Sequence, residues 1–359
     1  MTDLAVLGQD PSFGGGAAAM TTAFIELTRG LGRDPDVLFV PHPSFDGARS
    51  SPLDRVEALR ILRGSRRLVP ALEQAGEVWV VAALATHGYA AARSGRPYTC
   101  WLATSLADEN RGRLPGLPFS RRVAAQLNAP ALSRLERAVL RGAKHVYGIS
   151  AASRASLVRA GGLQEDQVDV LAIPVDLEHF APEPDEQWLA RLERPVLTFI
   201  GRADDPRKNV ALALEALPLV RARLPEATLQ LVGRRPSRRL PEGATALGEI
   251  PSVAEPLRRS ALLLLPSRQE GFGIVTAEAL AAGVPVVATR SGGPEQLLRE
   301  SGGGVVLDGW EPQELADAIV ALLEDRDRLL ELRRRGRAYV QQQHAPAVIA
   351  ERLRQALDG

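Results

Sequence analysis

Residues 267–283 read SRQEGFGIVTAEALAAG, and this stretch carries most of the information about the fold. It follows the apolar run LLLLP at residues 262–266, which has the length and composition of a buried strand. Two glycines in its middle allow a sharp bend, and residues 274–282 then read as a helix that Gly283 ends. A buried strand, a glycine-rich loop and a helix in this order predict one unit of a parallel sheet.

The same alternation continues in both directions from this stretch. Segments such as residues 133–142, 210–224 and 315–323 carry apolar residues at i, i+3 and i+4, and short apolar runs lie between them. Nearly continuous apolar strands between amphipathic helices indicate an α/β protein with parallel sheets covered on both faces. The predicted strands lie at residues 4–8, 36–40, 78–83, 98–103, 145–150, 168–173, 196–201, 227–233, 262–266, 285–288 and 304–307.

Two such blocks in series predict two doubly wound, Rossmann-like domains. The chain of 359 residues is long enough for two domains of about 150–180 residues each. The junction is expected near residue 176, because a polar stretch with two prolines, APEPD, follows at residues 181–185. We therefore assign residues 1–176 to a first domain, 177–337 to a second and 338–359 to a terminal helix. The arginine-rich run RRRGR at residues 333–337 is interpreted as a solvated helix face.

Composition excludes several classes of function. The net charge of +1 gives no general attraction to nucleic acid, so no nucleic-acid partner is expected. One cysteine excludes an intramolecular disulfide, and no segment resembles a signal peptide or a membrane span, so we expect a cytoplasmic protein. The five histidines are scattered, and no phosphate-binding loop of the ATPase type is present. We expect neither a bound metal nor a cofactor.

The helix predicted after Gly273 offers a site for an anion. The amides near Ile274, Val275 and Thr276 point out of its N-terminus, where a diphosphate would be stabilised. Glu278 lies one turn inside the helix and could accept hydrogen bonds from ribose hydroxyls, while Glu270 at the loop tip could reach a sugar. Alternatively, Glu278 only complements the helix dipole and Glu270 is a solvated loop residue.

A second loop supplies two cations. Residues 199–209 read FIGRADDPRKN, in which a strand ends at Gly201 and a helix begins near residue 209. Arg202 and Lys208 are placed to stabilise the charge that develops on a departing nucleoside diphosphate, without a metal. The alternative is an ordinary basic surface loop, and this is our interpretation of Arg207.

These spacings resemble glycosyltransferase family 4, whose members are retaining enzymes with the two-domain GT-B fold. The resemblance rests on Gly201-Arg202 with Lys208 six residues later, and on Glu270 with Glu278 eight residues later. It extends through SGGPE at residues 291–295 and covers nearly the whole second half. Further matches are Ile149-Ser150 with Ser153, and residues 173–176 with Phe180.

The resemblance implies that two Rossmann-like domains face each other across a cleft, with the donor on the second and the acceptor on the first. It also implies that the terminal helix crosses back to the first domain. The catalytic residues would be Arg202, Lys208 and Glu270. The donor-binding residues would be Gly15, Gly16, Gly201, Gly271, Phe272, Gly273, Ile274, Val275 and Glu278.

The first domain matches the family less closely. Residues 14–16 form a glycine run after the first strand, which either approaches the donor or the acceptor or is a flexible turn. His87 ends the third strand as a histidine often does in the family, although a lone histidine can equally be structural. Thr104 stands where many members carry a histidine that contacts the sugar. Asp108 and Glu109 follow and could bind acceptor hydroxyls.

The sequence therefore predicts a transfer from a nucleoside-diphosphate-sugar to a hydroxyl of an unidentified small-molecule or glycan acceptor, and the resemblance implies that this transfer is retaining. By resemblance, attack is from the front face. Two alternatives remain: a sugar phosphorylase or synthase of the same family, and a catalytically idle nucleotide-sugar-binding protein. Peripheral membrane contact is a further option, through a basic helix face flanked by apolar residues; the alternative is a helix packed on the sheet. The residues of that face are Leu132, Arg134, Leu135, Arg137, Val139, Arg141 and Lys144.

Overall fold

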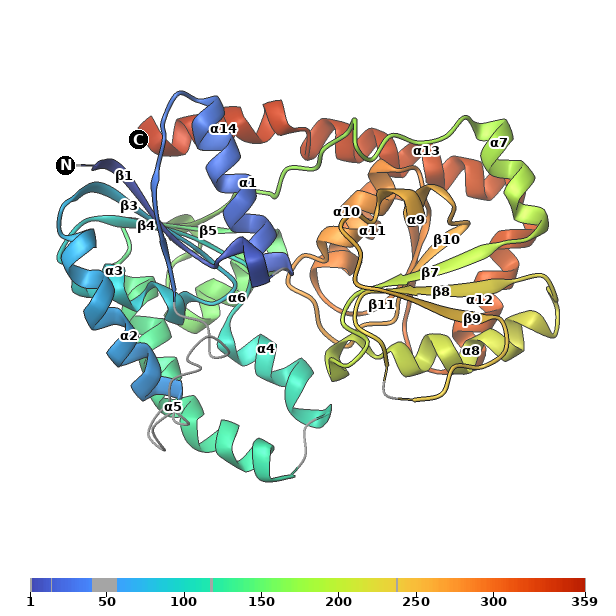
Figure 1. The fold of residues 1–359 in the computed structure, drawn as a ribbon, viewed down its shortest axis with the longest axis horizontal. Helices are drawn as coiled ribbons and strands as arrows, with labels where there is room; N and C mark the ends of the chain where they lie inside the picture. The colour runs from blue at the N-terminus through green and yellow to red at the C-terminus, as the bar shows by residue number, and fades with distance from the viewer. Residues whose placement is uncertain (1, 14, 41–56, 117–118, 237, 359) are drawn as a thin grey trace. The chain divides into compact units, whose positions relative to one another are not determined.

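The computed structural model describes residues 2–13, 15–40, 57–116, 119–236 and 238–358. The chain divides into two compact units (Figure 1). The first comprises Met1–Ile173 with Ile349–Gly359, and the second comprises Pro174–Val348. Each unit is built around one parallel sheet with helices on both faces, which confirms the predicted α/β class.

The sheet of the first unit has six strands in the order β2-β1-β3-β4-β5-β6 within the described residues. All neighbouring pairs are parallel. The central strands β3 and β4 are almost wholly buried, which explains their continuous apolar sequence. The strands are β1 Thr2–Gly8, β2 Asp36–Phe39, β3 Ala75–Ala82, β4 Tyr98–Leu102, β5 His145–Gly148 and β6 Val168–Val170.

Helices of the first unit connect these strands and cover the sheet. Three aromatic residues fill the space under α1: the ring centroids of Phe24 and Trp79 lie 4.9 Å apart, and those of Phe24 and Trp101 lie 6.0 Å apart. The α-helices are α1 Gly16–Gly30, α2 Glu57–Leu72, α3 Tyr89–Arg93, α4 Leu106–Arg113, α5 Phe119–Gly142 and α6 Ala151–Gly161. The short 3-10 turns are η1 Pro11–Phe13, η3 Ala85–Gly88, η4 Leu114–Gly116 and η5 Glu165–Gln167.

The sheet of the second unit has six described strands in the order β12-β11-β10-β7-β8-β9, again all parallel. Phe199, Leu262 and Ile319 are fully buried in its core. The strands are β7 Val196–Ile200, β8 Thr228–Val232, β9 Ala244–Gly248, β10 Leu262–Leu265, β11 Val286–Thr289 and β12 Gly304–Leu307.

The helices of the second unit lie between and after these strands, and the last of them extends into the first unit. The α-helices are α7 Asp185–Ala190, α8 Val210–Arg221, α9 Ala254–Arg258, α10 Ile274–Ala281, α11 Gly293–Ser301, α12 Pro312–Glu324, α13 Arg326–Gln343 and α14 Pro346–Asp358. The 3-10 turns are η6 Arg191–Glu193 and η7 Pro206–Lys208. The final residues of α14, from Ile349, group with the first unit.

Strand β9 is absent from the sequence-based prediction. Its residues, ATALG, alternate between partly buried and exposed positions at the edge of the sheet. Strand β9 has only one neighbouring strand, and the side chains that it packs on the core are small, those of Ala244 and Ala246. Its sequence therefore lacks the continuous apolar run that marks the other strands.

The prediction of one terminal helix over residues 338–359 is wrong. Helix α13 begins far earlier, at Arg326, and ends at Gln343, and α14 starts at Pro346. His344 leaves the helical conformation, with φ −124° and ψ 4°, and proline has no N–H to continue a helix.

The solvated-face interpretation of residues 333–337 is also wrong for Arg333 and Arg337. The side chain of Arg333 is only 3% exposed, pairs with Asp185 at 3.0 Å and lies over the ring of Trp188 at 4.8 Å. Arg337 donates hydrogen bonds to three backbone carbonyls, those of Leu177, Phe180 and Ala281. The two arginines therefore bind residues 177–185, which link the two sheets in the sequence, to helix α13. Their side chains do not form the solvated face that was predicted.

Candidate active site

The predicted catalytic residues lie where the chain order reverses in the second sheet. Strands β7 and β10 are neighbours, and from this pair the sheet grows outward in opposite directions, toward β8 on one side and β11 on the other. In open α/β sheets, ligands bind beyond the carboxyl ends of strands at such a switch point. The loop after β7 carries Arg202 and Lys208, and the loop after β10 carries Glu270.

Lys208 and Glu270 form an ion pair across this switch point. Lys208 Nζ donates to Glu270 Oε1, and the two side chains are only 18% and 11% exposed. Ser267 Oγ donates to the same carboxylate oxygen at 2.9 Å. The sequence predicts both charged residues but neither their pairing nor the part of Ser267, which stands only three residues before Glu270.

Backbone hydrogen bonds hold the loops around this pair. The amide of Arg268 donates to the carbonyl of Arg207 at 2.7 Å, which joins the β7 and β10 loops. The amide of Glu270 donates to the carbonyl of Ser291 at 2.7 Å, and Glu270 forms an isolated parallel bridge with Gly292. Hydrogen bonds to the β7 loop and to residues 291–292 therefore fix the backbone that carries the Glu270 side chain.

Arg202 is held by an acidic residue that the sequence did not single out. Its guanidinium pairs with the Asp205 carboxylate at 2.7 Å and stays 53% exposed. Arg207 pairs with Asp205 as well, through its side chain at 2.8 Å and its amide at 3.0 Å. Burial opposes ionisation of Asp205, but the hydrogen bonds and charge of Arg207, with the charge of Arg202, outweigh it and bring the pKa to about 2. Arg207 is thus part of the loop's framework and not a free surface residue.

Helix α10 presents its N-terminus beside the Glu270 loop. Its N-cap is Gly273, whose φ of 69° is the left-handed conformation that favours glycine. The prediction of an outward-pointing amide is wrong for Thr276, whose amide donates to the carbonyl of Gly273 at 2.7 Å. The amides of Ile274 and Val275 have no intrahelical acceptor at these positions, so they are available to an anion.

The start of helix α11 packs against the same glycine loop. A side-chain carbon on Gly293 would lie 2.1 Å from the carbonyl oxygen of Gly271, so only glycine fits there. Pro294 similarly fills the space beside Gly273. Phe272, 4% exposed, turns inward, with its ring centroid 5.3 Å from that of His344. The SGGPE motif therefore supports the glycine bend.

Three buried polar atoms near these loops have no hydrogen-bond partner among the described residues. They are Oε1 of Gln269, Oγ1 of Thr276 and Oγ of Ser291. Unsatisfied buried polar atoms are uncommon in proteins and need an explanation. Gln269 lies directly before Glu270, Thr276 lies in the first turn of α10, and Ser291 lies before the N-terminus of α11. These positions are consistent with a polar ligand at this site.

Glu278 lies one turn inside α10, as predicted, and is partly buried. Its carboxyl group has no hydrogen bond or ion pair to another described residue. Burial raises its pKa from 4.5 to about 7. Hydrogen bonds donated by hydroxyl groups would stabilise the charged form of this buried carboxyl group.

The sheet of the first unit also has a switch point, between β1 and β3. The loop after β1 leads to Gly15, the N-cap of α1 with φ 83°, and to Gly16, the first helical residue; Gly14 lies outside the described residues. The loop after β3 carries His87, which is partly buried in η3. The structure thus places Gly15, Gly16 and His87 in the segments that follow two neighbouring strands.

The remaining acceptor candidates lie on the next strand end and on α4. Thr104 is 7% exposed, and its amide donates to the carbonyl of Ala83 at 3.0 Å, which places it beside the His87 loop. The Asp108 carboxylate is bound by Arg111 at 2.7 Å and Arg159 at 3.2 Å. Glu109, the next residue on α4, is partly buried.

A buried carboxyl group that the sequence did not reveal ties α4 to α5. Glu136 is 2% exposed and accepts a hydrogen bond from the amide of Leu106 at 2.8 Å. Burial, against that hydrogen bond, raises its pKa to about 7. A single glutamate on a basic helix gives no sequence signal for such a position.

The match to a protein-family model lies in the second unit. The family model described as glycosyl transferases group 1 matches residues 194–325. Residues 194–325 are a group 1 glycosyltransferase domain. This glycosyltransferase domain contains both motif loops and helices α8 to α12, so the recognition of the family from its motifs is confirmed.

Two curated relatives extend the similarity. D-inositol 3-phosphate glycosyltransferase 1 of Catenulispora acidiphila is 32% identical over 228 residues, which is 57% of this chain and 54% of that protein. A GDP-mannose-dependent alpha-(1-6)-phosphatidylinositol monomannoside mannosyltransferase of Mycobacterium tuberculosis is 32% identical over 257 residues, which is 62% of this chain and 65% of that protein. The chain thus matches between about half and two thirds of the length of these relatives.

Solved structures confirm the fold over the whole chain. Anabaena Alr3699/HepE, solved in complex with UDP, superposes with a TM-score of 0.74 at 21% identity and covers 99% of both chains. The predicted GT-B fold, with two Rossmann-like domains, is therefore that of this chain.

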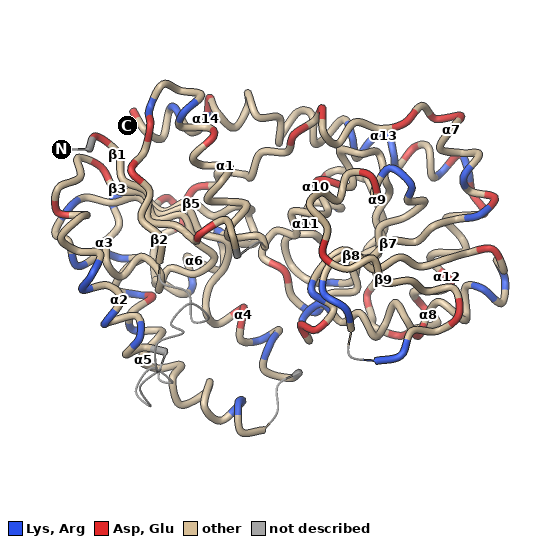
Figure 2. The backbone as a smooth tube through the Cα atoms, in the orientation of Figure 1, with Lys and Arg blue, Asp and Glu red and all other residues tan. Residues whose placement is uncertain are grey.

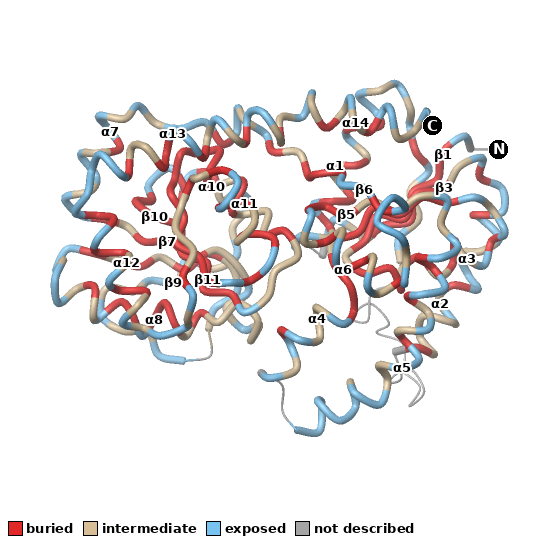
Figure 3. The backbone as a smooth tube through the Cα atoms, turned by 180° about the vertical axis from the view of Figure 1, so that it is seen from behind, coloured by how far each residue is buried: buried red, intermediate tan, exposed pale blue. Residues whose placement is uncertain are grey.

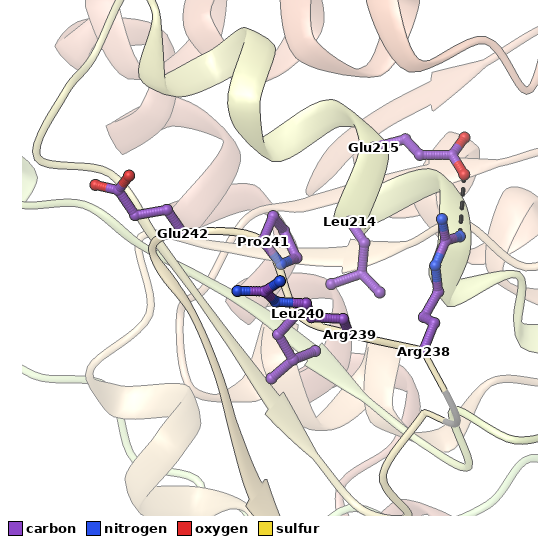
Figure 4. Close-up of a pocket in the computed structure, with 7 residues that line it drawn as sticks. All are labelled: Leu214, Glu215, Arg238, Arg239, Leu240, Pro241 and Glu242. Carbon is purple, nitrogen blue, oxygen red and sulfur yellow. Dashed lines mark hydrogen bonds and ion pairs between the residues drawn. The ribbon is translucent and has the colours of Figure 1, made fainter.

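Other features lie apart from the glycosyltransferase motifs. A surface hollow between α8 and the segment before β9 is spanned by a Glu215–Arg238 ion pair of 3.0 Å (Figure 4). It contains none of the predicted site residues. Its lining consists of Leu214, Glu215, Arg238, Arg239, Leu240, Pro241 and Glu242. Within the described ranges, no three histidine, cysteine or acidic residues are grouped so that they could hold a metal ion.

The helix predicted as a membrane-contacting face is α5. Its residues Leu132 and Val139 are 4% and 0% exposed and belong to hydrophobic clusters of the first unit. The apolar residues of that prediction therefore pack inward, and the alternative of a helix packed on the protein core is correct for them. In the part of the chain that the structure describes, no helix combines the length and apolar character needed to span a bilayer.

Proposed function

We propose that the chain is a retaining glycosyltransferase that moves a sugar from a nucleoside-diphosphate-sugar to a hydroxyl group without a bound metal. The Lys208–Glu270 ion pair at the switch point of a group 1 glycosyltransferase domain carries this proposal. A fixed cation and a fixed carboxylate stand side by side there, next to the open N-terminus of α10.

In this proposal the second unit holds the donor. The diphosphate lies against the α10 amides of Ile274 and Val275 and contacts Lys208 and Arg202. Glu278, one turn further along, accepts hydrogen bonds from the ribose. Glu270 accepts a hydrogen bond from a hydroxyl of the transferred sugar, which explains why its carboxylate is positioned so firmly by Ser267 and Lys208.

The proposed reaction exchanges one bond at the anomeric carbon for another. The bond from that carbon to the phosphate oxygen breaks, and a bond to the acceptor oxygen forms on the same face. The acceptor's proton passes to the departing diphosphate, so no side chain is required as a base. Arg202 and Lys208 stabilise the charge on the leaving group, and this role replaces a metal ion. Retention and the front-face path rest on the resemblance to family 4.

The names of the relatives suggest the first substrates to test. One relative is GDP-mannose-dependent, and the solved Anabaena structure contains UDP. We propose GDP-mannose as the first donor and UDP-glucose as the second. An inositol phosphate and a phosphatidylinositol mannoside are the first acceptors, because the two relatives are named for such compounds. A cytoplasmic location, where the single cysteine would stay reduced, is part of the same proposal.

Thermal shift with GDP, UDP and ADP tests donor binding. A ligand at 100 times its Kd adds about 2.7 kcal/mol of stability, so the correct base should stand out from the others. Transfer is then followed with the matching sugar donor and acceptor, and the anomeric configuration of the product is read by NMR. An inverted product contradicts retention. Turnover that requires inorganic phosphate identifies a phosphorylase, and nucleotide binding without turnover on any acceptor identifies an idle binding protein.

A further inference from the structure

Trp310 differs from the other tryptophans of the chain in its exposure. The sequence contains four tryptophans, and Trp310 is 39% exposed. The other three are at most 1% exposed: Trp79, Trp101 and Trp188. Trp310 follows three residues after the end of β12 at Leu307. It therefore lies beyond the carboxyl end of a parallel strand, at the edge of the sheet where ligands bind in open α/β proteins.

Arg268 brings Trp310 next to the loop that carries Glu270. The guanidinium carbon Cζ of Arg268 lies 5.9 Å from the centroid of the Trp310 ring. Strand β11 lies between β10 and β12 and is buried throughout, so the two side chains meet beyond the strand ends (Figure 3). Arg268 and Glu270 are two positions apart in the loop after β10, so their Cα atoms are at most about 7 Å apart. The exposed ring is therefore a neighbour of the proposed sugar-binding carboxylate.

Charged side chains hold the loop that carries Trp310. Glu314 Oε1, on α12, accepts hydrogen bonds from the amides of Asp308 and Gly309 at 3.2 Å and 3.4 Å. The Asp308 carboxylate pairs at 2.5 Å with Arg290, the first residue after β11. Because the loop is already held in place, little conformational freedom is lost when a ligand packs on the ring.

The guanidinium of Arg268 is available to an anion. Its side chain is exposed and forms no ion pair with a carboxylate in the part of the chain that the structure describes. By contrast, Arg290 pairs with Asp308, and Arg207 pairs with Asp205. An aromatic face thus stands beside a cation whose charge no carboxylate of these residues neutralises, and a guanidinium binds phosphate or carboxylate well.

We propose that Trp310 and Arg268 form an acceptor subsite, and that its ligand is a sugar or cyclitol ring that carries an anionic group. The apolar C–H face of such a ring packs on the indole, and the phosphate or carboxylate pairs with Arg268. A nucleobase also stacks on tryptophan, but the donor phosphates are proposed to lie with Lys208, whose loop follows β7 on the other side of β10. The subsite rests on the proposed function, in which Glu270 holds the transferred sugar.

Quenching of tryptophan fluorescence by acrylamide tests the subsite without turnover, because three of the four tryptophans are buried. The probes are an inositol phosphate, glucose 6-phosphate and glucuronate, each with GDP or UDP present. We expect them to lower the quenching constant toward that of Trp310→Phe, which keeps only the buried tryptophans. Inositol and methyl glucoside should need at least about tenfold higher concentrations, because they lack the charged partner of Arg268. Inorganic phosphate has no ring and should give no protection.

Transfer kinetics give a second test with the anionic acceptors. Trp310→Ala should raise the acceptor KM by at least about tenfold and leave the donor KM and kcat close to those of the wild type. Trp310→Phe should restore most of the affinity, because it keeps an aromatic face. Arg268→Ala should raise the KM for an anionic acceptor but not for its neutral analogue.

Matched controls remove similar side chains elsewhere in the second unit. Arg326→Ala removes an exposed arginine from α13, a helix on which Figure 2 shows several basic residues. Leu247→Ala removes an exposed apolar side chain from β9, at the opposite edge of the same sheet. Both variants should keep the wild-type acceptor KM.

The outcomes separate the subsite from the proposed function. The subsite is wrong if no ring protects Trp310 from acrylamide, or if Trp310→Ala lowers the Tm and keeps the wild-type acceptor KM, which would mean that the indole only packs on Arg268. Protection by GDP or UDP alone would assign the indole to the nucleobase and overturn the acceptor subsite. Protection by the anionic rings without transfer from any nucleotide-sugar would support the subsite and contradict the transferase function.

Discussion

Replacing Glu278 with glutamine should stabilise the protein at alkaline pH and leave it unchanged at acid pH. Burial raises the pKa of Glu278 in the folded chain from 4.5 to about 7. Between these values the folded chain binds more protons than the unfolded chain. The free energy of unfolding therefore falls as the pH rises through this window, and the loss is complete above about pH 7.

The size of the effect follows from the shift. A shift of about 2.5 pKa units corresponds to about 3 kcal/mol at 1.36 kcal/mol per unit. For a unit of this size, 1 kcal/mol moves the Tm by about 2–4 °C, so Glu278→Gln should raise the Tm at pH 8 by up to about 6–12 °C. At pH 4.5 and below, the two proteins should melt alike. Glu136 titrates in the same pH window, but it is present in both proteins. Its contribution to the free energy of unfolding therefore cancels when the two proteins are compared.

The same carboxyl group should make nucleotide affinity depend on pH. Ribose hydroxyls that donate to Glu278 favour its charged form, so the Kd for GDP or UDP should fall about tenfold between pH 6 and pH 8. Glu278→Gln should bind the nucleotide more weakly and lose this dependence, and it also controls for ionisation of the phosphates. Equal Tm differences at pH 5 and pH 8 would show that the pKa is not raised. Unchanged nucleotide affinity in the variant would remove Glu278 from the ribose.

The remaining predictions concern the other charged groups of the site. Lys208→Ala or Arg202→Ala should lower turnover by roughly 10²–10³, the usual effect of losing one donor to a developing charge; near-normal rates in both folded variants would exclude them from the mechanism. Activity should survive EDTA, because two cations serve the diphosphate; loss on chelation with recovery on adding Mg²⁺ or Mn²⁺ would contradict this. Glu270→Gln should lower kcat while leaving calorimetric affinity for the free nucleoside diphosphate intact, because that ligand lacks the transferred sugar. A loss of affinity equal to that of Glu278→Gln would mean that Glu270 is misassigned.

Most strands could be predicted because a strand buried on both faces has a nearly continuous run of apolar residues, which is visible in the sequence. Runs such as LLLL at β10 have the length and composition of a buried strand, and all predicted runs correspond to strands. Strand β9 could not be predicted, because apart from its backbone pairing with β8 it packs only the small side chains of Ala244 and Ala246 against the core. Backbone hydrogen bonds form with almost any side chain, so they leave no recognisable residue pattern in the sequence.

Burial of charged side chains was the least predictable feature. Arg333 and Arg337 stand in a run of four arginines among five residues, which looks like a solvated surface. Their burial depends on the carbonyls and carboxylates of residues 177–185, about 150 positions away in the sequence. Glu136 depends in the same way on an amide of α4. Nothing local distinguishes such a residue from an exposed one.

The ion pair between Lys208 and Glu270 is a tertiary feature, and it changes how the Lys208 variant must be interpreted. Removing Lys208 deletes a cation for the diphosphate, and it also leaves the mostly buried Glu270 carboxylate with Ser267 as its remaining side-chain partner among the described residues. A buried charge that loses its partner is costly, so part of the lost turnover in Lys208→Ala would come from a displaced Glu270 side chain. Comparing Lys208→Ala, Glu270→Gln and the double variant separates the two effects. If Lys208 acts only on the leaving group, the two fold-losses in kcat multiply; if it acts mainly by holding Glu270, the double variant is no slower than Glu270→Gln alone.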